Sequence, residues 1–133
     1  MTSVFADTFY FFALLSDKDE AHAKAVAWSN DYRGGLITTE WVLIELADGL
    51  ASSRQRNLFP DVRRHLLANP QYDVVSLELP LYEQGLLLFE ARPDKEWSLT
   101  DCISFVVMNR EGITEALTGD HHFEQAGFVA LLK

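Results

Sequence analysis

Four carboxylates lie beside short apolar segments of this chain, where an ionised group is costly. They are Asp7, Glu45, Asp101 and Asp120. An ionised acid in such surroundings is destabilising unless another group compensates its charge. A shared divalent cation is the simplest compensation, and a cation held by carboxylates promotes phosphoryl transfer. The four acids therefore predict a metal-dependent nuclease.

Each acid also has an ordinary structural interpretation, which stays open at the level of sequence. Asp7 could cap the helix that follows it, and Asp120 could be a routine turn residue. Glu45 falls in the otherwise apolar stripe of a helix, where it could reach water or pair with an arginine. Ser98 and Asp101 have the spacing of a capping box. No single acid decides between these roles and metal binding, so the four are judged together.

Electrostatics favours a common role for the four acids. Two carboxylates about 5 Å apart repel by roughly 3 kcal/mol at an effective dielectric of about 20. Protonation or a cation must relieve that repulsion, and oxygen ligands favour Mg²⁺ or Mn²⁺. Thr8 and Thr118 are candidates for orienting ligands or water. His121 and His122 are not assigned as ligands, because adjacent side chains diverge.

The segments that must position these acids alternate between strands and helices. We expect strands at residues 3–7, 36–38, 72–76, 115–117 and 129–132. Helices are expected at residues 8–15, 17–33, 40–51, 54–69 with a break near 59–60, 80–92, from a Ser98 cap to 110, and briefly after 120. This alternation predicts an α/β domain with a parallel sheet covered on both faces. Ligands of such sheets bind at the carboxyl ends of the strands, where Asp7 and Asp120 fall.

The composition indicates one domain, residues 1–133, in a reducing cytoplasm. The 133 residues include a single cysteine, Cys102, and 48% of them are hydrophobic. No run is long enough to span a membrane, and the N-terminus lacks the basic region of a signal peptide.

The net charge of −9 argues against nucleic-acid binding, since Lys and Arg usually supply the affinity for phosphate. Bound cations would offset part of that charge. Four basic residues also cluster at Arg54, Arg56, Arg63 and Arg64. That cluster could be a solvated helix face, a phosphate-contacting arm in which Arg54 and Arg56 bind substrate, or a surface for an acidic partner.

Four sequence motifs, in order, resemble those of PIN domains, and especially the VapC-like ribonuclease toxins of toxin–antitoxin pairs. Val4-Phe5-Ala6-Asp7-Thr8 is similar to the first motif, and Thr38-Thr39-Glu40-Trp41-Val42-Leu43-Ile44-Glu45 to the second. Ser98-Leu99-Thr100-Asp101-Cys102-Ile103-Ser104-Phe105 resembles the third and most specific motif. Ala116-Leu117-Thr118-Gly119-Asp120-His121-His122-Phe123 resembles the fourth. The likeness covers essentially the whole chain, and it departs from many relatives at Phe9, where they carry a polar residue.

The resemblance implies a three-layer α/β/α domain with a central, mainly parallel sheet. It also implies that the four acids hold Mg²⁺ or Mn²⁺ and cleave RNA phosphodiester bonds. It further implies a homodimer and, for the toxin branch, a cognate antitoxin.

The alternatives are a housekeeping PIN nuclease outside a toxin–antitoxin pair, or a catalytically silent PIN-fold module that binds protein. A phosphatase of the haloacid dehalogenase type is disfavoured, because it needs an aspartate at the position of Phe9.

Overall fold

A five-stranded parallel sheet forms the centre of the molecule. The structure is a computed structural model that describes residues 3–52 and 54–133. The strands lie in the order β3-β2-β1-β4-β5, and every neighbouring pair is parallel. Their bounds are β1 Ser3–Ala6, β2 Gly35–Thr39, β3 Tyr72–Val75, β4 Glu115–Leu117 and β5 Val129–Ala130. Neighbouring parallel strands need a long crossover between them, which explains why a helix follows almost every strand.

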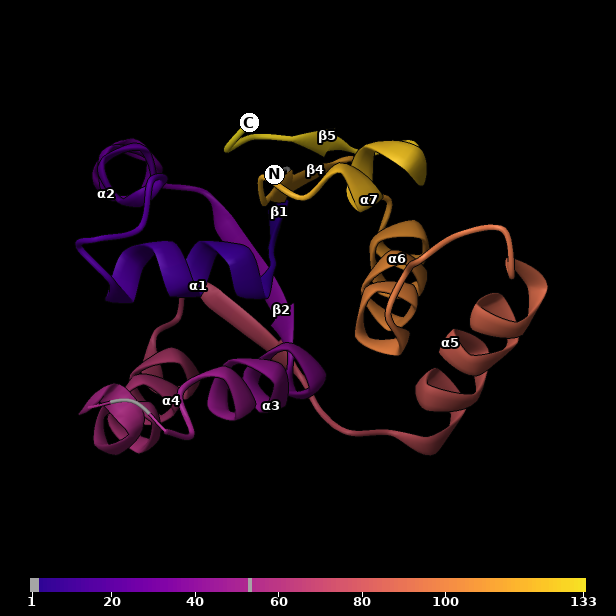
Figure 1. Ribbon diagram of the computed structural model, residues 1–133, viewed down its shortest axis with the longest axis horizontal. Helices are drawn as coiled ribbons and strands as arrows, with labels where there is room; N and C mark the ends of the chain where they lie inside the picture. Colours follow the sequence, from indigo (N-terminus) through magenta and orange to yellow (C-terminus); the bar gives the residue numbers. More distant parts are fainter. Residues whose placement is uncertain (1–2, 53) are drawn as a thin grey trace.

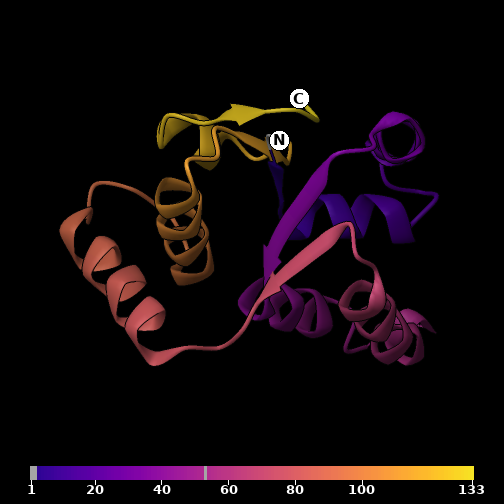
Figure 2. The same cartoon turned by 180° about the vertical axis from the view of Figure 1, so that it is seen from behind.

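Helices cover both faces of this sheet, which confirms the predicted α/β/α layers. The helices are α1 Thr8–Leu15, α2 His22–Asp31, α3 Glu40–Gly49, the 3₁₀ helix η1 Arg54–Leu58, α4 Phe59–Ala68, α5 Leu79–Ala91, α6 Leu99–Glu111 and α7 His121–Gln125. Figures 1 and 2 show α1, α2 and α4 on one side of the sheet and α5 and α6 on the other. No helix in the described parts of the chain is both long and apolar enough to cross a membrane.

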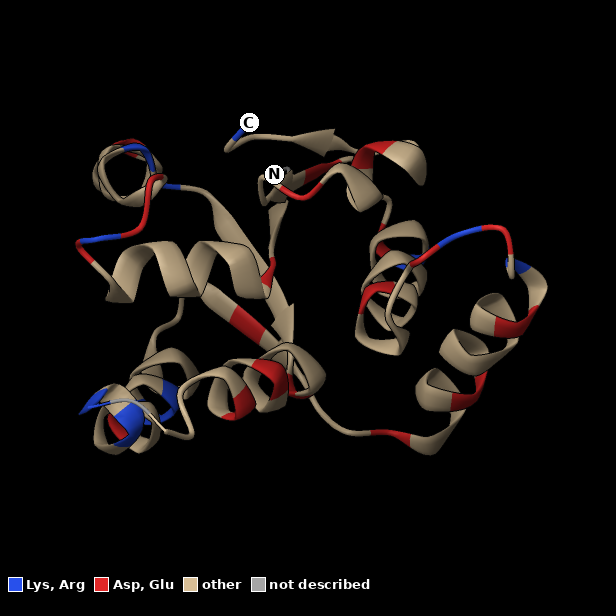
Figure 3. Ribbon diagram, viewed as in Figure 1, with Lys and Arg blue, Asp and Glu red and all other residues tan. Residues whose placement is uncertain are grey.

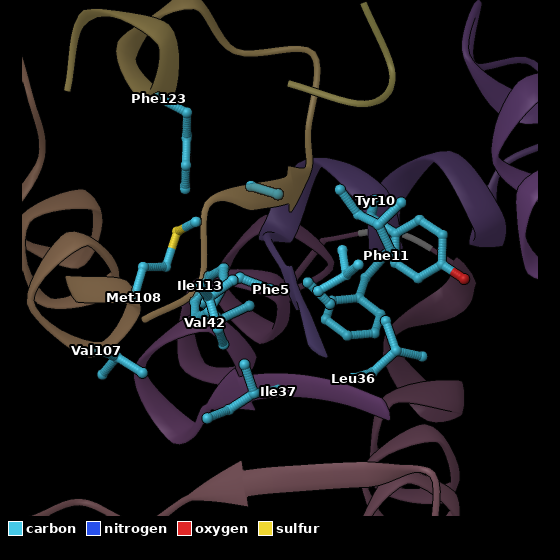
Figure 4. Packing of buried hydrophobic residues seen from close by; sticks show 14 of the residues in the cluster. Phe5, Tyr10, Phe11, Leu36, Ile37, Val42, Val107, Met108, Ile113 and Phe123 are labelled. Atoms are coloured by element: carbon cyan, nitrogen blue, oxygen red, sulfur yellow. The ribbon is translucent and has the colours of Figure 1, made fainter. Parts of the chain in front are cut away.

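The hydrophobic core follows from the apolar character of the central strands. Phe5 and Ala6 in β1 are fully buried, as are Ala116 and Leu117 in the neighbouring β4. Figure 4 shows Phe5, Val42 and Ile113 in the buried cluster together with Tyr10 and Phe11 from α1. A strand that is buried on both faces cannot alternate apolar and polar residues, and β1 does not.

Local signals set where the helices begin and end. The Thr39 hydroxyl accepts a hydrogen bond from the Val42 N–H and caps α3. Ser98 and Asp101 form the predicted capping box of α6. At the other end of α6, Gly112 takes a left-handed conformation with φ of 68°, which glycine adopts without a steric penalty. These caps hold the acid-bearing helices α3 and α6 at defined starting points.

Some predicted boundaries were wrong. The helix expected at residues 17–33 begins only at His22, because a turn occupies the preceding residues and the Asp19 side chain accepts from the Ala21 N–H. The last strand contains only Val129 and Ala130 of the expected residues 129–132. The break expected near residues 59–60 is confirmed, because the segment divides into η1 and α4 at Phe59, where Pro60 supports a new helix start. The remaining elements lie within about two residues of their predicted ends.

Candidate metal centre

The four predicted acids line one cleft of about 390 Å³. They come from four separated segments: Asp7 follows β1, Glu45 lies in α3, Asp101 lies in α6 and Asp120 begins α7. The cleft is lined by Asp7, Thr8, Phe9, Phe12, Glu45, Glu96, Ser98, Asp101, Asp120 and His122. It lies at the carboxyl ends of β1 and β4, which are neighbours in the sheet although far apart in the sequence. This is the edge at which parallel α/β sheets bind ligands.

The pairing of β1 with β4 places Asp7 beside Thr118. Ala6 is opposite Leu117 in the ladder, so the next residues of the two strands lie side by side. The Thr118 hydroxyl donates a 2.8 Å hydrogen bond to Asp7 Oδ2. The same hydroxyl oxygen accepts the Asp120 N–H at 3.0 Å. Thr118 therefore orients Asp7 and the loop that carries Asp120.

Thr8 holds the second acid in the same way. Its hydroxyl donates a 2.5 Å hydrogen bond to Glu45 Oε1, joining the start of α1 to the middle of α3. Thr8 is buried, and Glu45 is partly exposed to the cleft. Among the described residues, no arginine forms an ion pair with Glu45. The arginine-paired interpretation of Glu45 is therefore wrong.

Two acids also perform the structural roles that the sequence left open. Asp101 Oδ2 accepts the Ser98 N–H at 3.1 Å, and Asp120 Oδ1 accepts the His122 N–H at 2.9 Å. Asp7 occupies the cap position of α1, but its side chain makes no capping hydrogen bond there. Capping uses only part of the hydrogen-bonding capacity of a carboxylate, so it leaves lone pairs free for other contacts.

His122 lines the site although its sequence context did not predict it. Its Nδ1 lies 3.3 Å from Asp101 Oδ2 and 3.4 Å from Asp120 Oδ1. Candidate ligand atoms of Asp120, His121 and His122 lie within 4.8 Å of one another. His121 is largely exposed, whereas only 18% of the His122 side chain is accessible. The expectation that the adjacent histidines diverge is wrong, because their ring centroids lie 4.4 Å apart and both Nδ1 atoms lie within 3.6 Å of Asp120 Oδ1. Only His122 also reaches Asp101.

Burial makes the charged form of these acids unfavourable. Removal from water raises the pKa of Asp7 to about 7, helped by the negative charges of Asp101 and Glu45 and opposed by the hydrogen bond from Thr118. Burial also raises the pKa of Glu45, against the hydrogen bond from Thr8. The pKa of Asp101 is raised by burial and by the charge of Asp120. Strongly perturbed acids that share a cleft are typical of functional sites.

The donors in the cleft fit a hard divalent cation. Within residues 3–52 and 54–133, no lysine or arginine forms an ion pair with any of the four acids. Histidine is their nearest basic neighbour. Uncompensated carboxylate oxygens that repel one another are the ligands preferred by Mg²⁺ and Mn²⁺.

The predicted arginine cluster lies on η1 and α4, outside this cleft (Figure 3). Arg63 makes a two-pronged ion pair with Glu40, and Arg64 pairs with Asp61. Arg56 donates to the carbonyl of Ala51. Arg54 and Arg56 are exposed, and neither forms an ion pair within the described residues. Arg63 and Arg64 therefore stabilise the fold through ion pairs, whereas Arg54 and Arg56 are available to bind an anion.

The Thr118 hydroxyl provides a test of how the site is held. Thr118→Val is expected to cost about 1–3 kcal/mol of stability, because it leaves Asp7 and the Asp120 N–H without their partner. It should also weaken Mn²⁺ binding. Thr38→Val is the matched control, since Thr38 donates a buried hydrogen bond to the Ala6 carbonyl outside the cleft. Urea denaturation and Mn²⁺ titration of both variants would check this; equal loss of Mn²⁺ affinity in the two would contradict it.

This parallel sheet, with four acids at one edge, is characteristic of a known class of nuclease-like domains. The PIN domain family matches residues 4–129, and the chain belongs to that family. No curated protein gives a significant sequence match.

Several solved structures share the fold. VapC20 of Mycobacterium tuberculosis, described as a toxin that cleaves the sarcin–ricin loop, is 26% identical with a TM-score of 0.86, over 95% of this chain and 96% of that one. FitAcB of Neisseria gonorrhoeae is 16% identical with a TM-score of 0.68, over 96% and 94% of the two chains. A toxin–antitoxin complex from Klebsiella pneumoniae is 15% identical with a TM-score of 0.60, over 89% and 87%. The resemblance to PIN domains of the VapC type is therefore confirmed for fold and family.

Proposed function

We propose that the protein is a metal-dependent endoribonuclease and the toxin of a toxin–antitoxin pair. The observation that carries this proposal is the meeting of Asp7, Glu45, Asp101 and Asp120 in one cleft without a lysine or arginine partner among the described residues. A binding module has no need to assemble buried acids at such an electrostatic cost. The four acids are proposed as the metal ligands, directly or through water.

The residues of the chain prepare the cleft for phosphodiester hydrolysis. Thr118 and Thr8 fix the orientation of Asp7 and Glu45, and the capping box fixes Asp101 at the start of α6. When bound, Mg²⁺ or Mn²⁺ would activate water and neutralise charge on the scissile phosphate. One carboxylate of the set that contacts the metal only through water could accept a proton from the attacking water.

The comparisons support the substrate and the partner that we propose. The VapC20 neighbour is described as cleaving the sarcin–ricin loop, so a structured RNA loop is the proposed substrate type. Complexes of toxin with antitoxin recur among the structures with this fold, which supports a cognate antitoxin. A homodimer in the cytoplasm completes the proposal.

The direct test is cleavage of a mixed RNA substrate by purified, partner-free protein. Cleavage is expected with Mn²⁺ or Mg²⁺, is expected to stop with chelator, and should return when the metal is restored. Growth arrest on expression in bacteria would support a toxin over a housekeeping nuclease. A well-folded protein that neither cleaves RNA nor is stabilised by either metal would favour the silent binding module instead.

Arg54 and Arg56 are proposed to contact RNA phosphates outside the cleft. Replacing both with glutamine is expected to weaken RNA binding several-fold. The slope of log affinity against log salt concentration should become shallower by about 0.7 for each phosphate that is no longer neutralised. The control is Arg64→Gln, an exposed arginine that already pairs with Asp61. Binding titrations over a range of salt would measure the slopes, and unchanged slopes in the double variant would remove these residues from the interface.

A further inference from the structure

The cleft contains two aromatic rings, and its only basic side chain among the described residues is His122, which lies against Asp101 and Asp120. Phe9 and Phe12 line it together with five carboxylates, and its lining includes no lysine or arginine. Affinity for RNA usually depends on cationic side chains, so this cleft would repel the RNA backbone everywhere except at a bound cation. Some other interaction must hold the nucleotides beside the cleavage point. Stacking of bases on aromatic rings is the interaction that the lining residues can supply.

Both rings are placed by the helix that carries the first acid. Phe9 and Phe12 are three residues apart in α1, directly after Asp7, so they lie on neighbouring turns of one face. Both are half-buried: one side packs on the core and the remainder faces the cleft. Their position is therefore fixed by the same start of α1 that fixes Asp7.

Two glycines leave room for the rings next to the acids. A Cβ atom at Gly119 would lie 2.5 Å from Phe9 Cζ and 3.0 Å from each Cε atom. A Cβ atom at Gly49 would overlap the tip of the Phe12 ring. Gly119 immediately precedes Asp120, and Gly49 follows Glu45 by one helical turn in α3. One ring thus borders the loop of the fourth acid, and the other borders the helix of the second.

We propose that Phe9 and Phe12 are base-stacking residues that hold the nucleotides on either side of the scissile phosphate. Both rings come from α1, but Phe9 borders the loop that carries Asp120, whereas Phe12 borders the helix that carries Glu45. A base inside a duplex is already stacked on its neighbours, so the substrate must present unpaired bases, in a loop or a single strand. This inference rests on the ribonuclease function proposed above. It adds the residues that select unpaired RNA.

The test compares binding of two probes of equal length and charge, oligoadenylate and an abasic ribose–phosphate oligomer. Fluorescence anisotropy is measured with Mg²⁺ in an Asp101→Asn background, so that the probes stay intact. Oligoadenylate should bind about tenfold more tightly than the abasic probe. Adding Phe9→Leu or Phe12→Leu should reduce the affinity for oligoadenylate several-fold and leave that for the abasic probe unchanged. Leucine keeps the apolar packing and removes the flat ring.

Phe59→Leu is the matched control, because Phe59 is also a half-buried phenylalanine but lies in α4 outside the cleft lining. It should bind both probes like the background protein. Equal affinity for the two probes in the background protein would overturn the proposal. So would an equal loss for both probes in Phe9→Leu and Phe12→Leu, which would show a merely structural role.

Metal-dependent cleavage by the wild-type protein is measured alongside. If the protein cleaves RNA but binds oligoadenylate no more tightly than the abasic probe, the stacking proposal is rejected and the ribonuclease function stands. A folded protein that neither cleaves RNA nor is stabilised by metal rejects the ribonuclease function, and the stacking proposal with it.

Discussion

Asp101→Asn is expected to lower metal-dependent RNA cleavage about a thousandfold while leaving the fold intact. Loss of a charged ligand removes several kcal/mol of charge stabilisation at the metal, and each 1.36 kcal/mol is a factor of ten in rate. Asparagine keeps a side-chain oxygen that can accept the Ser98 N–H, so the cap of α6 should survive. Initial rates with Mn²⁺ and circular dichroism of both proteins would measure the two effects.

The matched control for this variant is Glu111→Gln, at the opposite, exposed end of the same helix. It removes the same charge from α6 but touches none of the residues that line the cleft. Its cleavage rate should equal that of the wild-type protein. Substantial cleavage by Asp101→Asn, or an equal loss in both variants, would contradict the role proposed for Asp101.

The metal-free protein is expected to lose stability as the pH rises from about 4 to about 7. The folded state holds the proton on Asp7 up to a pKa of about 7, whereas the ordinary pKa of this carboxyl is 3.8. The folded state therefore binds more protons in this window, and the free energy of unfolding falls as the pH rises. The difference between the two pKa values corresponds to roughly 4 kcal/mol. Glu45 and Asp101 act in the same direction.

Added metal should reverse this loss at pH 8. A cation that binds only the folded state at about a hundred times its dissociation constant contributes about 2.7 kcal/mol. At pH 5 its effect should be small, since protonated acids bind metal weakly. Asp7→Asn should flatten the pH profile of the metal-free protein, because asparagine does not titrate. Urea denaturation at a series of pH values, with chelator or with Mg²⁺, measures both effects; a metal-free protein that gains stability between pH 5 and 8 would contradict them.

The local features of the fold could be predicted from the sequence to a useful extent. Apolar runs located β1 and β4, and the Thr39 and Ser98 signals located the starts of α3 and α6. These features depend on residues close together in the chain, so short-range rules describe them. The helix expected at residues 17–33 failed at its start because Asp19 forms a local turn instead. Side-chain hydrogen bonds of aspartate compete with helix in this way.

His122 shows where sequence reasoning about the site reached its limit. The expectation that adjacent histidine side chains diverge is wrong here, because both Nδ1 atoms lie near Asp120 Oδ1. The sequence also does not say which of the two reaches Asp101. That choice depends on the direction in which α7 leaves the sheet, and on Phe123, which is fully buried and anchors the helix. The sequence feature that could have indicated His122 as a site residue is its position directly before Phe123, which is fully buried.

The order of residues along the chain is enough to select the groups proposed to carry the chemistry: four acids, and the apolar segments that make their charges costly. How these acids meet, and what surrounds them, depends on the folded molecule. The contact of Asp7 with Thr118 spans 111 positions and depends on the pairing of β1 with β4, which no local pattern encodes. The placement of Phe9 against Gly119 likewise depends on two segments that meet only in the folded chain. Long-range strand pairing and side-chain packing are properties of the whole chain, and for that reason they became visible only in the structure.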